Sequence, residues 1–272
     1  MNAPRPWTSA SSLTSIVLLT AALGAGGCRQ GATRMPMPEI ESRADSVAIA
    51  VLDAFGGREA WESLRYLRFT FALEPPGSRT EVAWHLWDRK TDRYRVEWLE
   101  GDSTVVAIFD IGSRDGEVFV GGVAADEEST DELLATAYRR FINDTYWLMA
   151  PVKMLDPGVN REYVADSSDA EFDVVRLTFG EVGLTPGDTY WIYVDRETNT
   201  VDRWSMVLEG NPNAPPATWY WREYRDFEVP GGVVRFATKK LVPDSSFAIA
   251  TDEIETPSNV PDSLFSAPHP VL

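Results

Sequence analysis

The spacing of apolar residues along the chain changes near residue 66, from a helical period to a period of two. Between residues 40 and 55 apolar side chains recur every three or four positions, which predicts an amphipathic helix. Pro38 suits the first turn of this helix, and Gly56 and Gly57 are expected to end it. A second, shorter helix is expected over residues 58–65.

Beyond residue 66, apolar and polar residues alternate in segments separated by turn residues, which predicts antiparallel strands. A helical segment interrupts them, with Ser129 and Glu132 at the spacing of a capping box. A long open sheet curls to protect its edges, so we expect an α+β fold with a strongly curved sheet of about 11 strands, an incomplete β-barrel. Helices are expected to cover its concave face. The strands are expected over residues 66–73, 81–89, 93–100, 103–111, 117–120, 172–180, 188–195, 200–209, 218–227, 233–242 and 247–253.

The N-terminal segment predicts export and a lipid anchor. Residues 1–27 contain a single charge, Arg5, and an apolar stretch over 13–23 that is shorter than the roughly 20 residues of a membrane span. The sequence Ala25-Gly26-Gly27-Cys28 resembles a bacterial lipobox, in which the cysteine is lipidated and becomes the first residue after cleavage. The alternative interpretation is an ordinary secretory signal with Cys28 as a free thiol.

These features define the expected domains and location. We expect a lipoprotein signal peptide over 1–27, a polar tether over 28–38 that starts at the lipidated Cys28, and a single domain over 39–272. Arg29 follows the cysteine in place of the Asp that retains enteric lipoproteins at the inner membrane. The expected location is therefore the bacterial cell envelope, anchored to the outer membrane and facing the periplasm.

Charge and rare residues exclude several classes of function. The chain carries 25 Lys+Arg against 42 Asp+Glu, a net charge of −17, and lacks the basic stripe that a nucleic-acid backbone requires. One Cys and two His exclude an internal disulfide and a Cys-based zinc site. The acidic groups at 126–128 and 166–173 lack the spacing of a calcium loop. We therefore expect no cofactor, no metal and no nucleic-acid partner, and a monomer.

Catalytic signatures are sparse. No GxSxG elbow is present, and His85 lies mid-strand among aromatic residues, which favours a hydrogen-bonded structural histidine. His269 is placed in an exposed C-terminal tail. Paired carboxylates such as Asp88 and Glu97 keep open an enzyme of envelope glycans or lipids, but nothing fixes their geometry. We expect the chain not to be an enzyme.

Aromatic residues are the strongest functional signal. Several strands carry aromatic side chains on both faces, so one face either lines a pocket or is filled as a core; a half-solvated sheet needs only one apolar face. The candidate ligand-cavity residues are Phe69, Phe71, Trp84, Trp98, Trp191, Tyr193, Trp204, Met206, Trp219 and Trp221. The candidate lid residues, on the central helical segment, are Leu133, Leu134, Ala137, Phe141, Trp147 and Leu148.

Four segments carry a resemblance to a known family: residues 55–61 (FGGREAW), 85–98 (HLWDRKTDRYRVEW), 143–148 (NDTYWL) and 182–191 (VGLTPGDTYW). They resemble a bacterial lipoprotein family of unknown function with the architecture of Lol-type (LolA/LolB-like) lipoprotein carriers and receptors. The resemblance implies that residues 39–272 form a half-barrel whose apolar cavity, capped by helices, holds acyl chains.

Two functions of different classes follow. The first is a membrane-anchored envelope lipoprotein that binds a lipid or acyl chain in the half-barrel cavity, in lipid or lipoprotein trafficking. The alternative is a non-catalytic envelope scaffold that docks a partner protein through its acidic, aromatic-rich surface.

Overall fold

The computed structural model of the chain describes residues 39–180 and 182–272, so the predicted signal peptide, Cys28 and the tether lie outside the described residues. Three helices are present in the described ranges: α1 (Arg43–Ala54), α2 (Gly57–Ser63) and α3 (Glu127–Lys153). The short 3-10 helices are η1 (Ala165–Ser167) and η2 (Asp262–Phe265). The strands are β1 (Tyr66–Glu74), β2 (Thr80–Asp88), β3 (Arg93–Glu100), β4 (Ser103–Asp110), β5 (Gly116–Val120), β6 (Val123–Ala124), β7 (Val159–Tyr163), β8 (Phe172–Phe179), β9 (Thr189–Asp195), β10 (Val201–Val207), β11 (Ala217–Val229), β12 (Gly232–Leu241) and β13 (Ala248–Glu255).

All strands belong to one antiparallel sheet, in the order β6-β5-β4-β3-β2-β1-β13-β12-β11-β10-β9-β8-β7. The α+β class and the single antiparallel sheet are confirmed, and the sheet is unclosed, with β6 and β7 at its edges. It has 13 strands in place of the expected 11 or so. The additional strands are β6, which is two residues long, and β7, which follows the central helix and pairs with β8. Both are too short to give a clear alternation.

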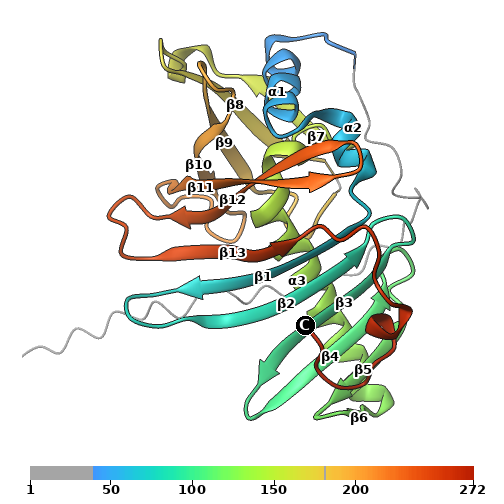
Figure 1. The fold of residues 1–272 in the computed structure, drawn as a ribbon. Helices are drawn as coiled ribbons and strands as arrows, with labels where there is room; N and C mark the ends of the chain where they lie inside the picture. The colour runs from blue at the N-terminus through green and yellow to red at the C-terminus, as the bar shows by residue number, and fades with distance from the viewer. Residues whose placement is uncertain (1–38, 181) are drawn as a thin grey trace, which may run out of the picture.

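The sheet has two halves that meet where β1 pairs with β13. We call β1–β6 the first half and β7–β13 the second half. Figure 1 shows β8–β10 running in a different direction from β1–β4, with α3 passing across the strands between the halves. Helix α3 contacts β4 and β5 in the first half and β12 and β13 in the second. We call the face of the sheet that α3 contacts the inner face.

One row of paired residues shows how the inner face is built. Phe69 pairs with His85, His85 with Val96, Val96 with Ala107, and Ala107 with Val118. Cross-strand partners share a face of the sheet, and all five residues are buried. The row therefore carries the inner face across five neighbouring strands of the first half.

Both predicted helix starts need correction. Helix α1 begins at Arg43, because the Ser42 hydroxyl accepts from the Asp45 amide at 3.1 Å and the Asp45 carboxylate accepts from the Ser42 amide at 3.1 Å. Ile40, expected in the apolar stripe, is 64% exposed. The N-cap of α3 is Asp126, whose carboxylate accepts from the Ser129 amide at 2.9 Å, one turn earlier than predicted.

The corner between α1 and α2 needs a glycine. Gly56 has φ +118, and a Cβ there would lie 2.0 Å from the Val233 carbonyl oxygen of β12. The indole of Trp61 donates to the Phe55 carbonyl at 2.8 Å across the same corner. The sequence FGGREAW therefore forms the turn that packs α1 and α2 against the second half of the sheet.

Candidate functional site

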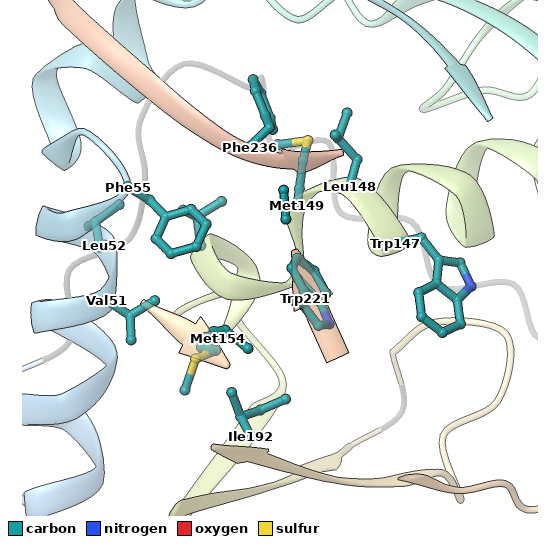
Figure 2. Packing of buried hydrophobic residues seen from close by; sticks show 14 of the residues in the cluster. Val51, Leu52, Phe55, Trp147, Leu148, Met149, Met154, Ile192, Trp221 and Phe236 are labelled. Carbon is teal, nitrogen blue, oxygen red and sulfur yellow. The ribbon is translucent and has the colours of Figure 1, made fainter. Parts of the chain in front are cut away.

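The inner face of the second half holds the largest cluster of buried apolar side chains in the described residues. Figure 2 shows its members converging from α1, from α3 and the residues after it, and from the strands. The labelled residues are Val51, Leu52, Phe55, Trp147, Leu148, Met149, Met154, Ile192, Trp221 and Phe236. The C-terminal part of α3 thus packs directly onto the strands, and side chains fill the space between them.

A stack of aromatic rings forms the centre of this region. Trp204 on β10 lies parallel to Tyr190 at 5.2 Å between ring centroids, and Tyr146 of α3 stacks on it at 5.9 Å. Trp147 meets the same indole edge-on at 4.5 Å, and Trp221 does so at 5.4 Å. Trp204 is therefore the ring on which α3 and strands β9 and β11 meet. We call Tyr146, Trp147, Tyr190, Trp204 and Trp221 the aromatic stack.

Three polar atoms of the aromatic stack are buried without a hydrogen-bond partner among the described residues: Tyr146 Oη, Trp204 Nε1 and Trp221 Nε1. A buried donor without an acceptor costs about 1–3 kcal/mol, and such groups are few in native proteins. All three groups donate, so the stack has unused capacity for hydrogen-bond acceptors.

A buried lysine adjoins the stack. Lys240 on β12 is fully buried, pairs across the sheet with Trp221, and places its ammonium 4.9 Å from the centre of that indole ring. Nζ donates to the Ala237 carbonyl at 2.8 Å and to Thr251 Oγ1 at 2.5 Å. None of the carboxylates in the described ranges lies within ion-pair distance of it. Burial holds the pKa of Lys240 well below its usual value.

The first half contains a different polar arrangement. His85 is fully buried; its Nδ1 is hydrogen-bonded to the Tyr94 hydroxyl at 2.9 Å, and its Nε2 lies 3.1 Å from Asp144 of α3. Asn143 donates to the other oxygen of Asp144 at 2.8 Å. Burial lowers the pKa of His85, and the Asp144 carboxylate opposes that shift. The histidine, expected to be hydrogen-bonded and partly buried, is wholly buried and joins β2 and β3 to α3.

The strand alternation separates the predicted cavity residues into two groups. Seven of them lie on the inner face: Phe69, Phe71, Trp98, Trp204, Met206, Trp219 and Trp221. The structure places the other three on the outer face: Trp84, Trp191 and Tyr193. Trp84 alternates with the inner residue His85, and Trp191 and Tyr193 flank the inner residue Ile192. Their assignment to the same surface as Trp204 was wrong, because a shift of one residue reverses the face.

The predicted lid residues all lie on α3. Ala137 and Phe141 are buried against β3–β5, with Leu133 and Leu134 half-buried beside them. Trp147 and Leu148 belong to the large cluster of the second half. The apolar run 146–151 continues the helix, with Pro151 in its last turn. One helix therefore covers both halves.

Two surface hollows in the described residues lie away from the aromatic stack. One, of about 660 Å³, is an open cleft between the hairpin turns that join β1 to β2 and β12 to β13, lined by Glu74, Arg79, Glu223 and Lys239 among others. The other, of about 190 Å³, lies beside Leu64, Pro230 and Pro257. Neither is bounded by the inner-face aromatic residues.

Solved structures with a similar fold include three bacterial proteins. A LolA superfamily protein from Nitrosomonas europaea is 10% identical, with a TM-score of 0.44 over 82% of this chain and 96% of that chain. A putative outer membrane lipoprotein-sorting protein domain from Vibrio parahaemolyticus is 5% identical, with a TM-score of 0.42 over 81% and 94%. A DUF1329 family protein from Desulfovibrio piger is 9% identical, with a TM-score of 0.38 over 82% and 96%.

All three TM-scores lie below 0.5 and all three identities are 10% or less. No protein-family profile matches the chain, and no curated protein matches it significantly. Any assignment of function therefore depends on the residues of this chain. Across the described residues, no helix combines the length and the apolar character needed to cross a membrane.

The paired carboxylates considered for catalysis lie on the outer face and are engaged by arginines. Asp88 lies 3.4 Å from Arg65 and 3.3 Å from Arg93, and Glu97 lies 2.6 Å from Arg95. The described residues contain no group of three or more His, Cys, Asp or Glu side chains placed to hold a metal ion. This geometry gives neither carboxylate the free position of a general acid or nucleophile.

The C-terminal tail covers this part of the outer face, which the sequence did not indicate. The Arg95 guanidinium donates to the carbonyls of Leu264, Ala267 and His269 at 3.1, 2.8 and 2.7 Å. Glu97 accepts from the Val271 amide at 2.9 Å. The tail around His269 is therefore fixed by its backbone, although the imidazole itself is exposed as expected. Alternating charges on a strand gave no sign of a contact more than 160 residues away.

Proposed function

We propose that this chain is a membrane-anchored lipoprotein of the bacterial cell envelope that binds a hydrophobic ligand, a lipid or acyl chain, and has no catalytic role. The ligand would lie between the inner face and α3, and α3 would act as the lid. The aromatic stack is the observation that carries this proposal, because it joins a large apolar surface to donors without acceptors.

The proposed ligand site opens when the C-terminal part of α3 moves away from β9–β11. An acyl chain would then take the place of Trp147 and Leu148 over Trp204. Burying an acyl chain gains about 25 cal/mol per Å² of apolar surface, which compensates for the lost contacts of the helix. In this proposal the helices cover the concave side of a curved sheet.

The proposed anchor is a lipidated Cys28, followed by the tether 28–38. Several acyl chains on one cysteine hold a protein far more firmly than one chain does. The proposed location is the outer membrane, facing the periplasm, where a ligand-binding domain on a tether would serve lipid or lipoprotein trafficking. Metabolic labelling with a fatty acid tests this anchor: we expect the wild-type chain to be labelled and the Cys28→Ser chain to remain unlabelled.

Native mass spectrometry of the Cys28→Ser chain, with oleate added, tests the ligand site. We expect bound oleate at one molecule per chain, and loss of that binding in Trp204→Ala. Trp191→Ala is the matched control, because Trp191 lies on the neighbouring strand but on the outer face. A protein that takes up no oleate and no other acyl compound would contradict the proposal.

The outer face supports the second candidate function, a scaffold that docks a partner protein. Here the Arg203 guanidinium lies 4.0 Å from the ring centre of Tyr193 and 4.7 Å from that of Phe172, with Trp191 on the same face. Tryptophan, tyrosine and arginine are the residues enriched at energetic centres of protein interfaces. A scaffold predicts a stoichiometric, salt-sensitive envelope partner that a Trp191→Ala/Tyr193→Ala chain loses. Oleate binding without such a partner would favour the first function.

A further inference from the structure

The donors of the aromatic stack form a continuous series that ends at Lys240. Tyr146 stacks on Trp204, Trp204 contacts Trp221 at 5.4 Å, and Trp221 lies beneath the Lys240 ammonium at 4.9 Å. The last three residues lie on β10, β11 and β12, which are neighbours in the sheet. The polar groups are therefore parts of one surface under α3.

The unpaired polar groups of this surface are all hydrogen-bond donors. Tyr146, Trp204 and Trp221 offer one unpaired O–H or N–H each, and Lys240 adds a fully buried amino group whose Nζ donates to the Ala237 carbonyl and Thr251 Oγ1. A purely apolar ligand would leave all of these groups as they are. A ligand that carries acceptor oxygens and a negative charge would satisfy them, because hydrogen bonds to ionised groups are the stronger ones.

We propose that the ligand of this site carries a carboxylate head group, which Lys240 and the donors of Tyr146, Trp204 and Trp221 bind while its acyl chain lies along the aromatic residues of the inner face. This inference rests on the proposed function and deepens it by naming the class of ligand, a long-chain fatty acid. Specificity then comes from buried polar groups that a hydrocarbon leaves unpaired.

The test compares three probes of equal chain length on the Cys28→Ser chain: oleic acid, oleyl alcohol and 1-octadecene. We expect oleic acid to bind about tenfold more tightly than 1-octadecene, with the alcohol between them, since each charge-assisted hydrogen bond changes affinity by roughly that factor. Dissociation constants come from quenching of tryptophan fluorescence and from native mass spectrometry.

Two variants locate the head group. Lys240→Met is expected to abolish the preference for the acid over the alcohol, and Tyr146→Phe to weaken oleic acid about threefold without changing 1-octadecene. The matched controls are Lys239→Met, whose ammonium pairs with Glu74 on the other face, and Tyr193→Phe on the outer face. Both controls should bind all three probes like the parent chain. Tyr146→Phe keeps the test valid if Lys240→Met fails to fold.

The outcomes separate the two proposals. Equal affinity for the three probes, unchanged by either variant, would overturn the carboxylate site and leave acyl binding intact. Failure of every probe to bind would overturn the acyl-binding function and the inference together. A preference for oleic acid that is lost in Lys239→Met but kept in Lys240→Met would also overturn the inference, because it would place the head group on the opposite face.

Discussion

The two halves of the inner face treat their buried polar groups differently, although one helix covers both. In the first half, Tyr94, His85 and Asp144 lie in a line with separations of 2.9 and 3.1 Å, and each has a polar neighbour. In the second half, three donors of the aromatic stack have none among the described residues. In the first half Trp87 Nε1, His85 Nε2 and Asp144 Oδ2 also lack a hydrogen bond to a described residue, but the last two atoms face each other at 3.1 Å.

This difference distinguishes the region that fixes α3 to the sheet from the region that could bind a ligand. Two buried polar groups that face each other fix the elements that carry them, whereas donors with no polar group opposite make the addition of a ligand more favourable. Asp144 and Tyr146 are two residues apart on α3. The helix therefore changes, within a single turn, from a residue that faces a buried polar partner to one whose hydroxyl has none among the described residues. We infer that α3 is held at His85 and is displaceable over Trp204.

The largest expected effect disrupts the second half at its helical corner. Gly56→Ala places a methyl group 2.0 Å from the Val233 carbonyl oxygen at φ +118, so the free energy of unfolding should fall by about 4 kcal/mol. Gly77→Ala is the control: φ is +73 there, but no atom lies within 4 Å, so the loss should be about 1 kcal/mol. Urea unfolding measures the free energy of unfolding of both variants. Equal losses would show that Gly56 is not packed tightly against Val233.

The next effect breaks the fastening in the first half. Asp144→Ala removes the carboxylate 3.1 Å from His85 and should lower the free energy of unfolding by about 3 kcal/mol, because the imidazole stays buried without that partner. Asn143→Ala, next to it and exposed, should cost less than about 1 kcal/mol. If the two variants unfold alike, His85 and Asp144 do not hold α3.

A matched pair of tyrosines compares the two halves directly. Tyr94→Phe removes the hydroxyl that is hydrogen-bonded to His85 and should cost about 1–2 kcal/mol of unfolding free energy. Tyr146→Phe removes an unpaired hydroxyl and should leave stability unchanged or raise it by about 1 kcal/mol. Thermal or urea unfolding measures the free energy of unfolding of both variants. A larger loss of stability in Tyr146→Phe than in Tyr94→Phe would contradict the proposed difference between the halves.

The last effect is a pH dependence of the first half. Burial lowers the pKa of His85 in the folded chain, with Asp144 opposing the shift and Arg140 adding to it. The unfolded chain therefore binds a proton near pH 6.5 that the folded chain resists, so stability falls as pH falls below that value. Relative to His85→Gln, the wild type should lose up to about 1.4 kcal/mol per pH unit below pH 6.5. Parallel stability curves from pH 8 to 5 would contradict this assignment.

Much of the fold was open to prediction because it depends on short-range patterns. Alternation with a period of two identified nearly every strand, and periods of three to four identified α1 and part of α3. Helix starts were missed by a turn or less, since Ser42 and Asp126 compete with other capping residues nearby and only the observed hydrogen bonds choose among them. Trp147 and Leu148 lie on the same helix as the other predicted lid residues, and this helix extends to Lys153.

The residues of this chain alone determine the classes of structure and chemistry: alternating strands around a central helix, an acidic net charge, and aromatic residues in excess of what one apolar face needs. Only the tertiary structure decided which aromatic residues face α3, because the faces of a strand differ by one residue of register and Trp84, Trp191 and Tyr193 fall on the opposite side. It alone also brought Asp144 to His85 and the C-terminal tail to Arg95, contacts between residues 59 and more than 160 positions apart. Periodicity carries no information about such pairs, since they form only when strands and helices from distant parts of the chain pack together.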